Sequence, residues 1–173
     1  SIRPVLRSMT GWFPPRWPSS NGVCVIEDIQ ERTFWGEKKL YYILRSTHNE
    51  ALKLYYPVET AQSQLTEIVS KKKAELILEQ FKNPPDPWNE RMQERQHSYQ
   101  KILKSNNHIQ IAKMVNTILR RKIELESQEK KLSSGDQQLL NQVLPILYKE
   151  LAVSLDISVE VVIKEVEQLI QNH

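Results

Sequence analysis

The sequence predicts an α+β protein, in which a small N-terminal antiparallel sheet or SH3-like β-barrel is followed by a compact C-terminal helical bundle. Residues 23–58 contain short runs rich in β-branched and aromatic residues, and turn residues separate these runs. After Pro57 the apolar residues recur at helical spacing, and that spacing continues to the end of the chain. A chain of 173 residues is long enough for one domain or two small ones.

The strand predictions rest on closely spaced apolar and aromatic runs in the first part of the chain. The first run is continuously apolar before it softens into alternation, and the later runs are aromatic and β-branched. Such strands bury one face of a sheet and need protected edges. In order, the predicted segments are Val23–Ile29, Thr33–Lys39 with a turn at Gly36, Lys39–Arg45, a turn at Ser46–Glu50, and Ala51–Val58.

Helical segments fill the rest of the chain, and each has an apolar stripe that predicts burial in a common core. Proline kinks or breaks a helix interior, so the three prolines of the segment Asn83–Pro87 are predicted to form a stiff hinge between two bodies. The predicted helices are Ser70–Phe81 with a serine cap, residues 87–103, residues 108–123, residues 136–155, and a last helix that opens at Ser158.

Composition argues against several classes of protein. No apolar run approaches the ~20 residues that a membrane-spanning helix needs. Cys24 is the only cysteine, which excludes a disulfide framework and a cysteine zinc site and fits a reducing, cytoplasmic compartment. The four histidines form no metal or catalytic motif, and no glycine-rich phosphate loop is present. We therefore expect no enzyme activity, no metal and no cofactor.

A basic region surrounds Trp88 and leaves two interpretations of that residue open. Residues 81–122 carry 9 Lys+Arg against 3 Asp+Glu, whereas residues 123–173 carry 4 against 9. In one interpretation Trp88 is structural and packs on the next turn of its helix at Met92. In the other, Trp88 is an aromatic wedge for the DNA minor groove, and Arg91 and Arg95 lie at i+3 and i+7 on the same helical side to hold phosphates.

Five motifs in order resemble the CarD/CdnL family of bacterial RNA polymerase-binding transcription regulators. Each motif alone is weak, but their order and the strand-to-helix switch match the family over residues 18–170. The motifs are NGVCVIEDIQERTFWGEKKLYYIL (Asn21–Leu44), YYPVETA (Tyr55–Ala61), PWNER (Pro87–Arg91), LSSGDQQLL (Leu132–Leu140) and ILYKELA (Ile146–Ala152).

The resemblance implies a Tudor-like domain over residues 21–82 that binds the polymerase β subunit, and a helical DNA-binding domain over residues 83–173. It implies a monomer that stabilises the promoter open complex without reading sequence, by wedging Trp88 into the minor groove at the upstream edge of the bubble. The alternative is a protein–protein interaction module in which Trp88 is purely structural. The expected polymerase-binding residues are Arg32, Phe34 and Tyr55, and the expected DNA-binding residues are Trp88, Arg91, Arg95, Arg120 and Arg121.

This chain also departs from the family pattern. Tyr55 stands where other members have a basic residue, and Glu90 and Gln93 stand where basic residues flank the tryptophan. Fewer phosphate contacts predict weaker DNA binding with a shallower dependence on salt. Residues 1–20 match the family poorly, and the sequence leaves open whether that segment is wholly native.

Overall fold

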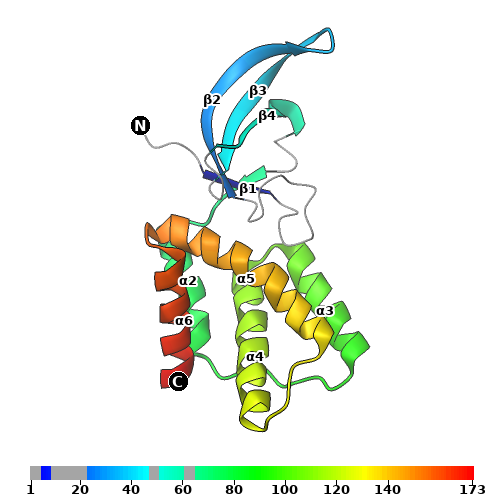
Figure 1. The fold of residues 1–173 in the computed structure, drawn as a ribbon, viewed down its shortest axis with the longest axis vertical. Coiled ribbons are helices and arrows are strands. Elements are labelled where there is room, and N and C mark those ends of the chain that lie inside the picture. Colours follow the sequence, from blue (N-terminus) through cyan, green and yellow to red (C-terminus); the bar gives the residue numbers. More distant parts are fainter. Residues whose placement is uncertain (1–4, 9–22, 47–50, 61–64) are drawn as a thin grey trace. The chain divides into compact units, whose positions relative to one another are not determined.

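The chain folds into two compact units, Ser1–Ile68 and Val69–His173. The computed structural model describes residues 5–8, 23–46, 51–60 and 65–173. The first unit contains an antiparallel sheet and the second is helical (Figure 1), so the predicted α+β class is confirmed.

The first unit is a five-stranded antiparallel sheet with the strand order β4-β3-β2-β1-β5. Its longest strands form the β2–β3 hairpin, which curves along its length (Figure 1). Strands β2, β3 and β4 correspond to the predicted runs, whereas β1 and β5 were not predicted. The segment 9–22, where the family's first strand was sought, lies outside the described residues. The strands are β1 (Val5–Ser8), β2 (Val23–Phe34), β3 (Glu37–Ser46), β4 (Lys53–Pro57) and β5 (Leu65–Glu67).

The base of the β2–β3 hairpin provides the buried side chains of this unit. The strand register shifts between Ile26 and Asp28, and Glu27 lies at this shift. The Glu27 carboxylate pairs with Arg45, and one of its oxygens lies 3.8 Å from the Lys53 ammonium nitrogen. Such a bulge strengthens the local twist of the strands. Among the residues of this unit whose burial is described, the buried apolar side chains are Val23, Cys24, Tyr41, Ile43 and Leu44.

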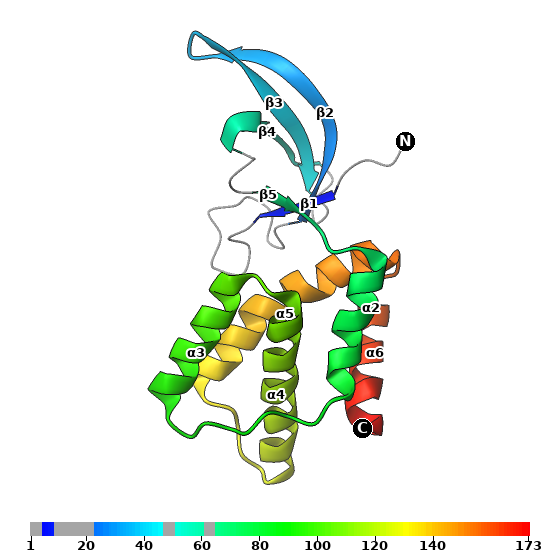
Figure 2. The same cartoon turned by 180° about the vertical axis from the view of Figure 1, so that it is seen from behind.

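The helices of the second unit pack together (Figure 2), and their buried side chains form a mainly aliphatic core. Side chains cap four of the five α-helices, because Ser70, Asn107, Ser133 and Ser158 each accept a hydrogen bond from a backbone N–H in the first turn. The elements are α2 (Lys71–Glu79), the 3-10 turn η1 (Gln80–Lys82), α3 (Met92–Ser105), α4 (His108–Ser127), α5 (Ser134–Leu155) and α6 (Val159–Asn172).

The boundary between the units lies earlier than predicted. The sequence placed it between residues 82 and 83, but α2 buries Ala74 and Ile77 within the helical unit. Val69 is tied to α5, since its carbonyl accepts from the Ser154 hydroxyl at 2.7 Å and its N–H donates to Glu150 at 3.4 Å. The proline segment 83–87 therefore lies inside one unit and is not a hinge between two bodies.

The helix that follows the prolines also starts later than predicted. It was expected from residue 87, but α3 begins at Met92 after an extended Arg91. The Asn89 side chain accepts a hydrogen bond from the Arg91 N–H at 3.0 Å and holds the turn that leads into α3. Trp88 thus lies in a connecting segment, where helical spacing does not govern its neighbours.

Candidate nucleic-acid interface and hairpin surface

Trp88 lies on a connection that hydrogen bonds fasten to α4. The Asp86 N–H donates to the Thr117 hydroxyl at 3.0 Å, and the Asn116 amide donates to the Asn83 carbonyl at 3.0 Å. Three prolines further restrict the backbone of this connection. The segment therefore presents Trp88 from a restrained backbone.

The Trp88 indole is half-buried, and two guanidinium groups lie over its ring. The guanidinium carbon of Arg95 is 4.5 Å from the ring centroid, and that of Arg121 is 5.4 Å away. Both distances fall within the range of cation–π attraction. The ring is therefore neither buried in the core nor fully exposed. Met92, on which Trp88 would pack in the structural interpretation, is 45% exposed.

Arg95 is buried, which contradicts its predicted contact with phosphate. Its side chain is 7% exposed and forms a two-pronged ion pair with Asp136, at 3.2 Å from Nε and 2.8 Å from Nη2. Its Nη1 donates to the Asn89 carbonyl at 2.8 Å. Spacing along a helix suggested an exposed arginine, but a carboxylate from α5 covers this position. Arg95 serves the fold around Trp88 instead.

Arg120 is also committed to the fold. Its Nε donates to the Asn116 side chain at 2.9 Å, and its Nη2 donates to the Phe81 carbonyl at 2.8 Å. The first bond lies within α4, and the second connects α4 to η1. Two of the three guanidinium nitrogens are thus bonded within the fold, which favours a structural role for Arg120 over the predicted phosphate contact.

Arg91 and Arg121 keep accessible surface, and each is paired with carboxylates. The Arg91 side chain is 81% exposed and lies 3.0 Å from Glu94, and this guanidinium holds the pKa of Glu94 below its usual value. The Arg121 side chain is 25% exposed and lies 3.1 Å from Glu124 and 3.6 Å from Glu90. A phosphate at either arginine would compete with these acidic partners.

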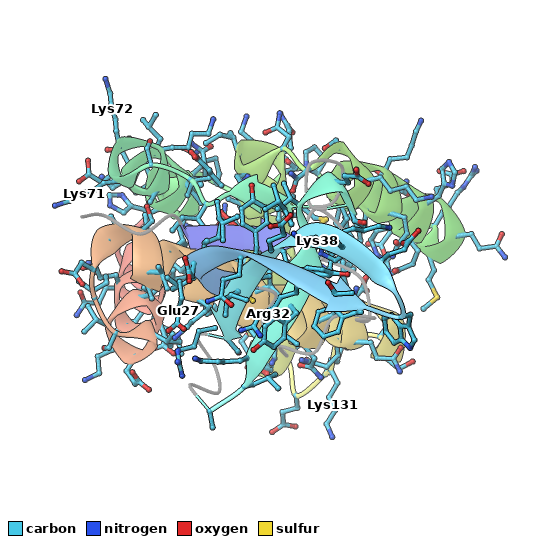
Figure 3. All side chains as sticks on the ribbon, turned by 90° about the horizontal axis from the view of Figure 1, so that it is seen from above. Glu27, Arg32, Lys38, Lys71, Lys72 and Lys131 are labelled. Atoms are coloured by element: carbon cyan, nitrogen blue, oxygen red, sulfur yellow. The ribbon has the colours of Figure 1, made fainter. Side chains whose placement is uncertain are left out.

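The three residues predicted to bind polymerase lie together on one face of the sheet. The Arg32 guanidinium carbon is 5.6 Å from the Tyr55 ring centroid, and the Phe34 and Tyr55 ring centroids are 5.8 Å apart. Phe34 also packs edge-on against Tyr41 at 5.0 Å. Arg32 is exposed on β2 (Figure 3), while Tyr55 is 45% exposed. The strand register thus assembles a surface from residues more than twenty positions apart.

Trp35 belongs to this surface and was missed by sequence reasoning. Its side chain is 99% exposed at the tip of the β2–β3 hairpin, and its ring centroid is 6.1 Å from that of Phe34. Both turn residues have positive φ, 51° at Trp35 and 80° at Gly36. Non-glycine residues rarely adopt this conformation, and a bulky one does so at a cost in strain. The signal was the Trp-Gly pair at a predicted hairpin turn.

Within the described ranges, no three His, Cys, Asp or Glu side chains gather as they would around a metal ion. None of the helices formed by these residues combines the length and apolarity required to span a membrane.

Comparison with known proteins links the helical unit to one family. The family model described as CarD, C-terminal domain matches residues 75–169, which is more than half of the chain. No curated protein matches the chain. The matched region contains α3 to α5 and the Trp88 connection, and it begins within α2, on the helical side of the boundary between the units. Proteins of this family are transcription-associated regulators without enzyme activity, and they interact with the transcription machinery. The chain belongs to the CarD/CdnL family.

Proposed function

We propose that this protein binds the β subunit of bacterial RNA polymerase through its sheet and stabilises the promoter open complex through Trp88. The indole enters the minor groove at the upstream edge of the bubble. The observation that carries this proposal is an indole that keeps exposed surface on a connection that hydrogen bonds fasten to α4. The protein would act in the cytoplasm, as a monomer bound to polymerase on the nucleoid, and would need no cofactor.

The proposed site on DNA follows from the cost of unstacking. Inserting an aromatic ring into intact duplex requires a few kcal/mol to open a base step. At the edge of the bubble the bases are already partly unstacked, so the same ring meets a smaller cost. The protein would favour this junction without base-specific contacts. Binding the open state more tightly by about 1.4 kcal/mol would shift the open-to-closed ratio tenfold.

The charges around Trp88 favour weak binding to free DNA. Of the arginines near the ring, Arg91 and Arg121 retain exposed surface, and each has a carboxylate partner within 4 Å. Each phosphate contact contributes roughly 0.9 to the salt dependence of binding, so we expect a shallow slope. Contact with polymerase would raise the effective concentration of the protein at the promoter and offset this weakness.

The hairpin surface has the composition of a protein-binding site. Arginine, tyrosine and tryptophan dominate binding hot spots, and Arg32, Tyr55 and Trp35 contribute them here. The lysines near the tip are neutralised, since Lys38 lies 3.4 Å from Glu31 and Lys39 lies 2.9 Å from Glu37. A nearly neutral aromatic surface suits a protein partner better than a nucleic acid.

Promoter melting with purified bacterial polymerase tests the proposal. We expect Trp88→Ala to abolish the stabilisation of open complexes and to leave polymerase affinity unchanged. Trp35→Ala is the matched control, because it removes a tryptophan from the hairpin surface. It should weaken polymerase affinity before it affects the stability of open complexes. Arg32→Glu should behave like Trp35→Ala. Equal loss of both activities in every variant would contradict two separate surfaces.

The alternative is a protein-binding module in which Trp88 only packs the connection between η1 and α3. The contact of the ring with the buried Arg95 favours this reading. Fluorescence of Trp88 in the polymerase–promoter complex separates the two functions, because an inserted indole stacks on bases and its fluorescence is quenched. No change in Trp88 fluorescence when the protein saturates this complex would favour the module.

A further inference from the structure

The Arg95 guanidinium connects the Trp88 ring to the start of α5. It lies over the indole at 4.5 Å and donates to the carbonyl of Asn89, the residue after Trp88, at 2.8 Å. The same group forms the two-pronged pair with Asp136. One planar cation therefore contacts the ring and its backbone, and it is held from another helix.

Asp136 is itself held on all sides. It is 1% exposed and accepts hydrogen bonds from Gln96 at 2.8 Å and from the Ser133 hydroxyl at 2.6 Å, in addition to those from Arg95. It lies in the first turn of α5, where its own N–H donates to Ser133 at 3.2 Å. A negative charge is favourable at a helix N-terminus. The Asp136 carboxylate therefore has little freedom to move, and the Arg95 guanidinium that it binds is restrained as well.

We propose that Arg95 and Asp136 are positioning residues that fix the orientation of the Trp88 ring. A buried ion pair is an inefficient way to stabilise a core, and apolar residues often do as well. A pair in which one partner also lies over a half-buried indole has a second use, because the ring is presented in one orientation before it meets a ligand. Less ordering is then needed on binding.

The chemistry of arginine is essential to this role. The flat guanidinium can stack on the ring while its edge donates to two carboxylate oxygens and a carbonyl. Lysine keeps the charge but offers neither the plane nor the paired donors. Arg95→Lys should therefore retain a cation in the pocket and release the ring.

Single-tryptophan protein tests the positioning without DNA. Trp12, Trp17 and Trp35 are changed to Phe so that Trp88 alone emits, and acrylamide quenching and time-resolved anisotropy are measured. In Arg95→Lys, and in the uncharged pair Arg95→Gln with Asp136→Asn, we expect stronger quenching and a new fast anisotropy decay. Unchanged quenching and anisotropy in both would overturn the proposal.

A control variant separates positioning from general loosening of the fold. Arg120 is a half-buried arginine of α4 that makes comparable structural hydrogen bonds, and no ring contact joins it to Trp88 within the described residues. Arg120→Gln should lower thermal stability without changing Trp88 anisotropy. If Arg120→Gln frees the ring as much as Arg95→Lys does, the effect is loss of structure and the proposal fails.

The consequence for transcription rests on the proposed function and is measured separately. Arg95→Lys should lose most of the open-complex stabilisation that Trp88→Ala loses, with unchanged polymerase affinity. If Trp88→Ala leaves promoter opening unaffected while Arg95→Lys frees the ring, the proposed function fails and the positioning stands. If Arg95→Lys frees the ring and keeps full open-complex stabilisation, open complexes do not depend on a fixed orientation of the ring. That result would contradict a role of ring positioning in transcription.

Discussion

Replacing Asp136 by alanine should strongly destabilise the helical unit. Arg95 is 7% exposed and Asp136 is 1% exposed, so removing the carboxylate leaves a buried positive charge without its counterion. Removing one member of a buried pair costs about 3–5 kcal/mol. A unit of this size loses about 4–8 °C in melting temperature per kcal/mol, so the transition should fall by at least about 12 °C. Such a loss would be a large fraction of the stability of an ordinary domain.

Far-ultraviolet circular dichroism follows this transition, since the helical signal comes mainly from the second unit. Glu94→Gln is the matched control, because it breaks the exposed pair with Arg91, and it should leave the melting temperature unchanged. Arg95→Met with Asp136→Leu should recover most of the loss, since an apolar pair leaves no charge uncompensated. A loss of less than about 1 kcal/mol in Asp136→Ala, typical of a surface pair, would refute the assigned burial.

Three further predictions follow from other parts of the chain. Burial raises the pKa of Tyr99 and of Tyr148 above the value of tyrosine in the unfolded chain, which is ~10. The two neutral side chains therefore stabilise the folded state fully below pH ~10, and this stabilisation is lost as pH rises toward the folded-state pKa values. A phenolate absorbance titration of the wild type against Tyr99→Phe and Tyr148→Phe should show these two tyrosines ionising only on unfolding, and their reversible ionisation near pH ~10 would contradict it. Trp35→Asn should stabilise the hairpin by about 1 kcal/mol, because asparagine tolerates the left-handed conformation, and should weaken polymerase binding; a urea melt and a binding titration check both, and lower stability would count against the strain. Glu90→Gln combined with Glu124→Gln should free Arg121 for phosphate, tighten DNA binding and steepen the salt slope by up to about 0.9; an unchanged slope would show that Arg121 makes no phosphate contact.

The helices were predictable because their signals are local. The serine that caps α2 and the serine that opens α6 precede apolar stripes, and both helices begin where those signals lie. Which core a helix joins is not a local property. The stripe of α2 gave no indication that Ala74 and Ile77 are buried within the helical unit, and the domain boundary was misplaced for that reason.

The candidate site was predictable in composition and only partly in geometry. Trp88 and the arginines were identified from their types and spacing, but spacing cannot reveal a partner that is distant in sequence. Asp136 removes Arg95 from the surface, and Phe81 and Asn116 occupy Arg120. On the sheet, Arg32 and Phe34 were expected only from the resemblance to the family, whereas the exposure of Trp35 followed from the conformation of the turn.

The lifetime of open promoter complexes formed with wild-type protein and with Trp88→Ala tests the central claim most directly. Polymerase affinity is measured in the same preparations, and Arg120→Gln is included to account for lost stability. We predict that Trp88→Ala shortens the lifetime of the open complex to that seen with polymerase alone, while the variant protein still binds polymerase fully. An unchanged lifetime in Trp88→Ala at saturating protein would contradict the account.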